Sequence, residues 1–183
     1  MHVPSNQEII VYGAGKTWAA QVLRELRDNH GVNINSRWIE LDGVLTGPED
    51  NFPEEAHTNT EFLREIWDNG CKQDCNNSDM MILIANPEDE AMHSGSLVEL
   101  GIVSGNDKPV YILGTCESFE PVGHSDRAWK SQVCVYYWPQ YVNDQIRGAM
   151  KALDHYREHY AAQWYNRRVR DRAAAAYRQA SHG

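Results

Sequence analysis

The sequence has no long apolar run, and this absence argues against an integral membrane protein. No stretch approaches the roughly 18 consecutive apolar residues that a membrane-spanning helix needs. The first residues, MHVPSNQE, have neither the basic region nor the apolar core of a secretory signal. We therefore predict a cytoplasmic protein with no membrane partner.

Paired cysteines and metal-ligand patterns are also absent. The four cysteines, Cys71, Cys75, Cys116 and Cys134, form no CxxC pair, and two thiols at i,i+4 spacing make a poor zinc site. No set of His, Asp and Cys has convincing metal-ligand spacing. We predict free thiols in a reducing compartment, with no metal and no cofactor.

The stretch IIVYGAGKTW, residues 9–18, resembles two phosphate-binding motifs but lacks one glycine of each. A P-loop needs glycine where Ile10 stands, and a dinucleotide fingerprint needs a third glycine where Trp18 stands. The turn Gly13-Ala14-Gly15 therefore needs another explanation than an ATPase or dinucleotide site.

Basic side chains are missing from residues 40–61, which carry seven acidic ones. The chain beyond residue 143 is the reverse, with eight basic residues against four acidic ones. A net charge of −9 argues against a general nucleic-acid binder, although the basic tail still allows a local contact. Shorter acidic runs, such as Glu88–Glu90, are typical of solvated surface.

The residues that are present predict a folded globule. With 183 residues, a hydrophobic share of 42% and six tryptophans, the chain can bury a proper core in a single domain. We place this domain at residues 1–142 and a helical extension at 143–183.

Strand and helix patterns alternate along residues 1–142. Apolar strands are expected at residues 9–12, 32–41, 80–85, 109–113 and 132–138. Helical stripes are expected at residues 19–30, 62–67 and 97–104, with a polar loop at 43–59. This alternation predicts an α/β fold with a five-stranded parallel sheet, flavodoxin-like (Rossmann-like), in the order 2-1-3-4-5.

The last forty residues predict one long helix. Its apolar stripe holds Ile146, Met150, Leu153, Tyr160 and Trp164. Beyond Trp164 the sequence keeps high helix propensity but has little to bury, so this end is either solvated and frayed or a subunit contact.

The strand order also predicts where a ligand binds. In open parallel sheets this place lies beyond the carboxyl ends of the strands, where the order reverses. Here it lies between the first and third strands, so the glycine turn should face the segment NPEDEAMHSGSLVELG, residues 86–101, across one pocket. This segment brings Glu99 into the first two turns of a helix, where it is either a partly desolvated carboxylate in the pocket or a solvent-facing one.

Three segments resemble the nucleoside 2-deoxyribosyltransferase family, including its relatives that hydrolyse nucleotide N-glycosidic bonds. They are VYGAGKTW at residues 11–18, IWDNGCKQDCNNSDMMILI at 66–84 and HSGSLVELGIVSGNDKPVYIL at 93–113. The third is close to the family pattern D-x-G-[ST]-x-x-E-x-G, and the three occur in the family's order.

The resemblance implies that Glu99 attacks the anomeric carbon of a sugar. A glycosyl ester forms, an acid protonates the departing base, and water or a second base resolves the ester, as in retaining glycosidases. The resemblance also implies a nucleoside or nucleotide as the small-molecule partner, and a homo-oligomer.

At position 93 the sequence differs from the family pattern. His93 stands where the transferases have an aspartate. With Ser94, Gly95 and Ser96 at a helix start, it suits a 5′-phosphate, although a histidine that caps a turn is an equal alternative.

The general acid is less clear from the sequence. The family's usual interval, counted back from Asp79, ends at Cys71. We favour Asp74, one helical turn later, over Asp79, which could instead brace the start of the third strand.

The remaining candidates surround the glycine turn. The family tyrosine that orients the nucleophile corresponds to Val11. Neighbouring strand side chains point to opposite faces, which leaves open whether Tyr12 fills that role. We predict substrate contacts from Tyr12, Gly13, Gly15 and Trp18, where Trp18 either stacks on a base or belongs to the core. His124, Asp126 and Trp129 contact substrate, a neighbouring subunit's site or solvent.

Three functions compete on this sequence. The first is cleavage or transfer at the N-glycosidic bond of a (deoxy)nucleoside or its 5′-monophosphate. The second is a nucleotide-binding module without chemistry on the same fold, with a glycohydrolase of NAD-type substrates as a variant. The third is a protein that acts through its basic tail on nucleic acid or on a protein partner.

Overall fold

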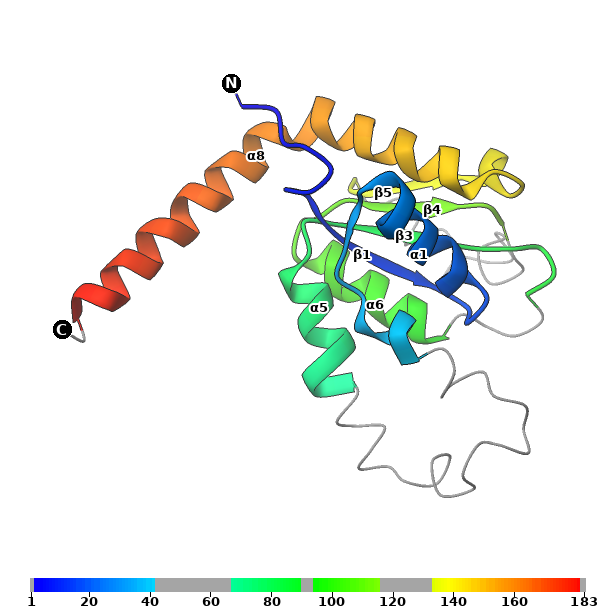
Figure 1. Cartoon of the computed structure of the whole chain (residues 1–183), viewed down its shortest axis with the longest axis horizontal. Helices are drawn as coiled ribbons and strands as arrows, with labels where there is room; N and C mark the ends of the chain where they lie inside the picture. The colour runs from blue at the N-terminus through cyan, green and yellow to red at the C-terminus, as the bar shows by residue number, and fades with distance from the viewer. Residues whose placement is uncertain (1, 42–66, 90–93, 116–132, 182–183) are drawn as a thin grey trace, which may run out of the picture.

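The computed structural model describes residues 2–41, 67–89, 94–115 and 133–181. A five-stranded sheet in the order β2-β1-β3-β4-β5 forms its centre, and all neighbouring strands run parallel. The strands are β1 (Ile10–Gly15), β2 (Asn33–Ile34), β3 (Met80–Ile84), β4 (Val110–Leu113) and β5 (Val135–Trp138). The predicted α/β fold, with its strand order, is confirmed (Figure 1).

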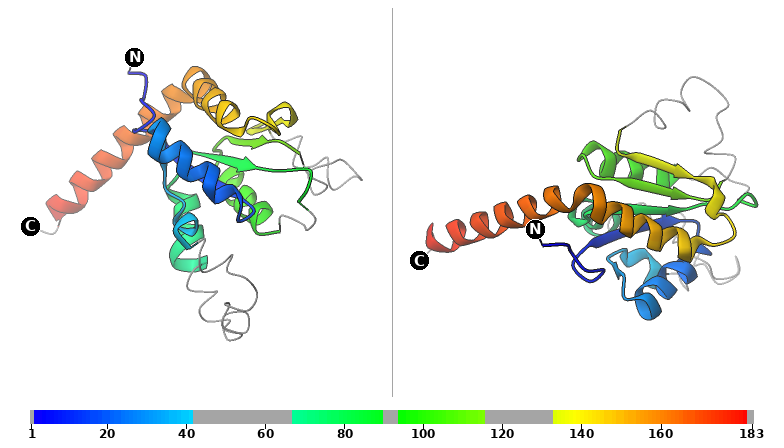
Figure 2. Two further views of the ribbon diagram at one scale, coloured as in Figure 1. Left: turned by 45° about the vertical axis from the view of Figure 1, so that its right-hand side comes forward. Right: turned by 90° about the horizontal axis from the view of Figure 1, so that it is seen from above.

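Helices cover both faces of the sheet (Figures 1 and 2). On one face lie α1 (Ala19–His30) and α8 (Gln145–Ser181), and on the other lie α5 (Lys72–Asn77) and α6 (Ser94–Gly105). Gly13 packs against Leu23 of α1, while its neighbour Tyr12 reaches α6 from the opposite face. Alternation along β1 therefore divides its side chains between the two helical layers.

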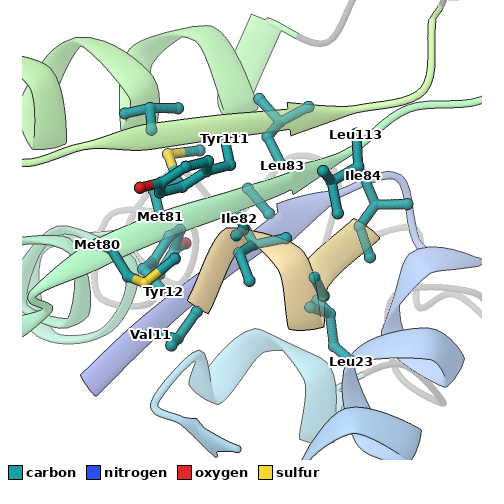
Figure 3. Close-up of a cluster of buried hydrophobic side chains, with 14 of the residues drawn as sticks. Val11, Tyr12, Leu23, Met80, Met81, Ile82, Leu83, Ile84, Tyr111 and Leu113 are labelled. Atoms are coloured by element: carbon teal, nitrogen blue, oxygen red, sulfur yellow. The ribbon is translucent and has the colours of Figure 1, made fainter. Parts of the chain in front are cut away.

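The core is centred on β3, as its apolar sequence predicts. All five residues of β3 have no exposed surface, because both of its faces are covered (Figure 3). Tyr111 of β4 and Leu23 of α1 are equally buried. Burying one large aliphatic side chain contributes about 1.5–3 kcal/mol, so this strand is a main source of stability.

The predicted and observed strand bounds agree within three residues except at the second strand. β1 does not end at Gly13 but continues to Gly15, and the strand expected at 32–41 is reduced to two residues followed by a 3-10 helix, η1 (Arg37–Leu41). The N–H of Gly13 donates to Ser36 Oγ at 2.6 Å, and Trp38 Nε1 donates to the carbonyl of Gly13 at 2.8 Å. The side chains of Ser36 and Trp38 thus form the hydrogen bonds to the backbone of Gly13 that a longer β2 would otherwise form.

Other expected elements are found at or near their predicted positions. α1 ends at Gly31, whose φ of 63° is left-handed, and α8 is the long C-terminal helix that the sequence predicts. The helical stripe expected at 62–67 is described only from Trp67, where the π-helix η3 (Trp67–Cys71) begins and leads into α5; the loop predicted at 43–59 lies outside the described residues. A short 3-10 helix, η5 (Pro139–Tyr141), follows β5.

Among the helices of the described residues, none combines the length and apolar character that crossing a bilayer requires.

Asp79 joins three elements at the start of β3. Its carboxylate, 2% exposed, accepts hydrogen bonds from the N–H of Ile10 at 2.9 Å, from Arg168 at 2.9 Å and from Arg167 at 3.3 Å. These contacts hold β1, β3 and α8 together, which is the bracing role that the sequence left open.

We expect Asp79→Asn to lower the free energy of unfolding by about 2–4 kcal/mol, because it removes the charged partner of two arginines at a buried position. Urea denaturation measures this loss. The matched control is Asp171→Asn on the exposed surface of α8, which should change stability by less than about 0.5 kcal/mol. Equal effects of the two substitutions would contradict the bracing role.

Candidate functional site

A buried hydrogen bond between Tyr12 and Glu99 forms the centre of the candidate site. The hydroxyl of Tyr12 donates to Glu99 Oε1 at 2.6 Å, and the two residues are 0% and 9% exposed. Tyr12 therefore orients Glu99 although it is one residue away from the position that the resemblance indicates. Val11 lies on the α1 side of the sheet with Gly13, because side chains alternate along a strand.

The buried position of Glu99 favours the protonated, neutral carboxylic acid more than exposure to water would. Burial raises the pKa of Glu99 to about 7, and the hydrogen bond from Tyr12 opposes this rise. Burial and the charge of Glu99 raise the pKa of Tyr12, so the phenol stays protonated and acts as the donor. Near neutral pH, Glu99 is therefore present as both the carboxylic acid and the carboxylate.

A buried carboxylate of this kind should reduce stability when it ionises. Folding raises the pKa of Glu99 from its ordinary value of 4.5 to about 7, so the folded state binds more protons than the unfolded state between these values. Stability is then lost as the pH rises from about 4.5 to 7.

We expect Glu99→Gln to stabilise the protein at pH 8 relative to pH 5, by up to about 3 kcal/mol, because glutamine has no charge to bury. Denaturation at both pH values measures the difference. Glu88→Gln, at an exposed position, is the control and should show no such pH dependence. If Glu99→Gln changes stability equally at both pH values, the raised pKa of the buried Glu99 is contradicted.

Two thiols line the same site. Burial, followed by the charge of Glu99, raises the pKa of both Cys71 and Cys75, so both thiols remain protonated. They are free thiols, as is Cys134, and Cys116 lies outside the described residues. In the described ranges, no group of three or more His, Cys, Asp or Glu side chains could hold a metal ion.

Asp74, the acid that the sequence favours, faces Arg37. Its carboxylate accepts from the backbone N–H of Arg37 at 3.0 Å and from Arg37 Nε at 3.0 and 3.1 Å. Asp79 is held by β1 and α8. The structure thus brings Tyr12, Cys71 and Cys75 to Glu99, whereas Asp74 and Asp79 form their hydrogen bonds with other groups.

Gly13 and Gly15, in the second half of β1, have a packing role. A Cβ on Gly13 would lie 2.4 Å from a methyl carbon of Leu23, and one on Gly15 would lie 2.7 Å from the Cβ of Ala19 and 2.9 Å from the carbonyl oxygen of Ile84. The packing of Leu23 of α1 against β1 therefore favours glycine at position 13, and the close approach of α1 and β3 favours glycine at position 15, independently of any ligand.

The turn after β1 contacts the segment after β3. Trp18 Nε1 donates to Asp89 Oδ1 at 2.7 Å, and the other oxygen of Asp89 accepts from the N–H of Asn86 at 3.0 Å. The two segments are thus neighbours at the carboxyl edge of the sheet, as the strand order predicts. The sequence placed Asp89 in a solvated acidic run and missed this contact, and its only signal was its position in the segment that follows β3.

The start of α6 supplies backbone donors at the same edge. Gly95 is exposed and Ser96 is buried in the first turn of this 12-residue helix, which has no acidic residue there. An N-terminus of this kind favours an anion. His93 and the side chain of Ser94, and the loop residues His124, Asp126 and Trp129, lie outside the described part of the structure.

A cavity of about 930 Å³ lies at the opposite edge of the sheet. It is bounded by the ends of α5 and α6 and by α8, and Asp79 lines it. Four basic residues and three acidic ones nearly balance on its walls, namely Lys108, Arg167, Arg168, Arg170, Asp79, Asp107 and Asp171. The cavity walls therefore have one excess basic side chain, and the cavity is separate from the Tyr12–Glu99 pair.

Comparison of the chain with models of known protein families and with curated proteins finds no match. The chemistry of the site is therefore inferred from its own residues. A buried carboxylate that a phenol orients can act as a nucleophile or a base, and the helix start beside it favours an anion.

Proposed function

We propose that the protein cleaves or transfers the N-glycosidic bond of a (deoxy)nucleoside or its 5′-monophosphate, with Glu99 as the nucleophile. The observation that carries this proposal is the buried hydrogen bond from Tyr12 to Glu99 at the switch point of the sheet. A small-molecule partner and a cytoplasmic location fit this activity, and the resemblance adds a homo-oligomer.

The proposed reaction has two steps. The free carboxylate oxygen of Glu99 attacks the anomeric carbon, and the bond from this carbon to the base nitrogen breaks with its electron pair going to the base. The base leaves after accepting a proton, and a glycosyl ester of Glu99 remains. Water or a second base then attacks the anomeric carbon, the ester bond to Glu99 breaks and restores the carboxylate, and the proton that the attacking group loses returns to the proton donor.

The proton donor in this reaction is proposed to be Asp74, with Asp79 as the alternative. Because Arg37 holds the carboxylate of Asp74, this contact has to open before Asp74 can carry a proton to a departing base. Asp79 would have to leave two arginines. A donor that must first open an ion pair predicts a slow enzyme or a substrate-induced rearrangement.

The 5′-phosphate is proposed to bind at the start of α6. Backbone N–H groups there, with the hydroxyl of Ser96 and with His93 and Ser94 from the sequence, suit a phosphate better than a bare hydroxyl. Gly95 allows close approach, since a Cβ there would meet nothing within 4 Å. Gly13, Gly15 and Trp18 are proposed to line the facing wall.

Incubation with deoxynucleosides, their 5′-monophosphates and NAD, followed by chromatography of the free base, tests the proposal. We expect base release, faster from a monophosphate than from the corresponding nucleoside. NAD as the best substrate would favour the glycohydrolase variant. No release from any member of the panel would contradict an enzyme.

A nucleotide-binding module without chemistry is the second candidate. The observation that favours it is the state of Asp74 and Asp79, each of which pairs with arginine rather than facing Glu99. Calorimetry that shows tight monophosphate binding, together with no base release, would support this module over the enzyme.

A further inference from the structure

The end of α8 extends beyond the domain to which the helix belongs. Residues 165–181, termed the tail here, follow the last buried residue of the helix, Trp164. Every residue from Val169 to Ser181 is exposed, and this part of α8 extends past the sheet and the other helices (Figures 1 and 2). At 1.5 Å per residue, the tail is about 25 Å long.

One face of the tail is apolar and has no partner in the described part of the chain. Tyr165 and Val169 are 48% and 46% exposed, and three alanines continue their line along the helix, with Tyr177, 77% exposed, beside them. The full line is Tyr165, Val169, Ala173, Ala176 and Ala180. Steps of three and four residues place these side chains on one face.

This face points away from the tail's own domain. Trp164, which is 6% exposed, and Arg168, which binds Asp79, mark the side of α8 that faces the domain. Ala175 lies eleven residues after Trp164 and seven after Arg168, so helical periodicity places it on this same side of α8. The apolar face, hereafter the outer face, therefore lies on another side of the helix.

The charge of the tail is opposite to that of the remaining chain. The tail has five arginines and one aspartate, hence a net charge of +4 in a chain of −9, which leaves −13 for the other residues. Arg167 and Arg168 are paired with Asp79. Arg170, Arg172 and Arg178 make no ion pair within the residues that the structure describes.

An isolated helix of this length is only marginally stable in water. The tail nevertheless combines exposed aromatic and aliphatic side chains with an excess of positive charge. These properties are typical of a segment that is covered in an assembly.

We propose that the tail docks its outer face on the acidic domain of a second copy of this chain. Because each copy carries both the basic tail and the acidic domain, the exchange is reciprocal and closes as a two-fold dimer. Two strips about 25 Å long and 10 Å wide, each covered from both sides, bury on the order of 1,000 Å², the lower range for a specific interface. Nucleic acid fits less well, since the strongly acidic domain repels a polyanion.

Sedimentation velocity of the full chain at about 50 μM tests this dimer with two matched double substitutions. A173E/A176E places two charges on the outer face, whereas A174E/A175E places the same two charges on other sides of the same exposed helix. Glutamate is a good helix former, so the tail stays helical in both variants, which far-UV circular dichroism checks.

We expect a dimer for the wild type and for A174E/A175E, and at least a tenfold weaker dimer for A173E/A176E. Raising the salt from about 0.05 to 0.5 M should weaken the wild-type dimer, because the attraction between tail and domain is screened. A monomeric wild type, including one that binds RNA through its tail, overturns the proposal. Equal effects of the two variants overturn the assignment of the outer face.

Discussion

Glu99→Gln should reduce the rate of base release by about 10³-fold or more, while the protein remains folded. The amide keeps the size of the side chain and can still accept the hydrogen bond from Tyr12. It cannot form the glycosyl ester, however, so the route through a covalent intermediate is closed. Steady-state release of free base, measured on the best substrate of the panel, gives this ratio.

Glu88→Gln is the matched control for this loss. Glu88 is exposed and lies in the same connection between β3 and α6. Its substitution should change the rate by less than about twofold. A loss below about tenfold for Glu99→Gln would show that this carboxylate is not the nucleophile, whatever the substrate.

Tyr12→Phe should lower the rate at pH 7 by about 10- to 100-fold, because a hydrogen bond to a charged group contributes about 1.5–3 kcal/mol. The substitution should also change the pH profile. The reactive form of Glu99 is the carboxylate, so the wild-type rate rises with pH around a midpoint near 7. Without the hydrogen bond that lowers the pKa of Glu99, the midpoint moves to higher pH.

Tyr111→Phe provides the comparison for Tyr12→Phe. Tyr111 is an equally buried strand tyrosine, but its hydroxyl is hydrogen-bonded to His155 Nδ1 at 2.9 Å on the α8 side of the sheet. Its loss can affect stability but should leave the midpoint unchanged. If Tyr12→Phe lowers the rate equally at every pH, Tyr12 acts through packing and not on the charge of Glu99.

The parts of the fold that depend on strong periodic patterns could be predicted from the sequence. β3 is apolar at every position because helices cover both of its faces, and α8 has an apolar stripe that continues to Trp164. The short length of β2 could not be predicted, because Ser36 and Trp38 replace strand pairing with side-chain hydrogen bonds to Gly13. Such long-range pairings leave no local pattern.

The candidate site was predictable at Glu99 and less so around it. The motif indicates a carboxylate in the second turn of a helix. Whether the Tyr12 side chain points toward this carboxylate depends on which side of β1 packs against α6. Asp89 belongs to an acidic run, and only its hydrogen bond to Trp18 distinguishes it from solvated neighbours. The partners of Asp74 and Asp79 are arginines distant in sequence, which no local spacing predicts.

Intact-protein mass spectrometry after incubation with a 2-deoxy-2-fluoro nucleoside tests the central claim most directly. The fluorine slows both steps of the reaction by destabilising positive charge at the anomeric carbon, so the glycosyl ester accumulates when the base is a good leaving group. We predict a mass increase of one fluorinated sugar, located on the peptide that contains Glu99 and absent from Glu99→Gln. Base release without a covalent adduct on Glu99 would contradict the proposed nucleophile.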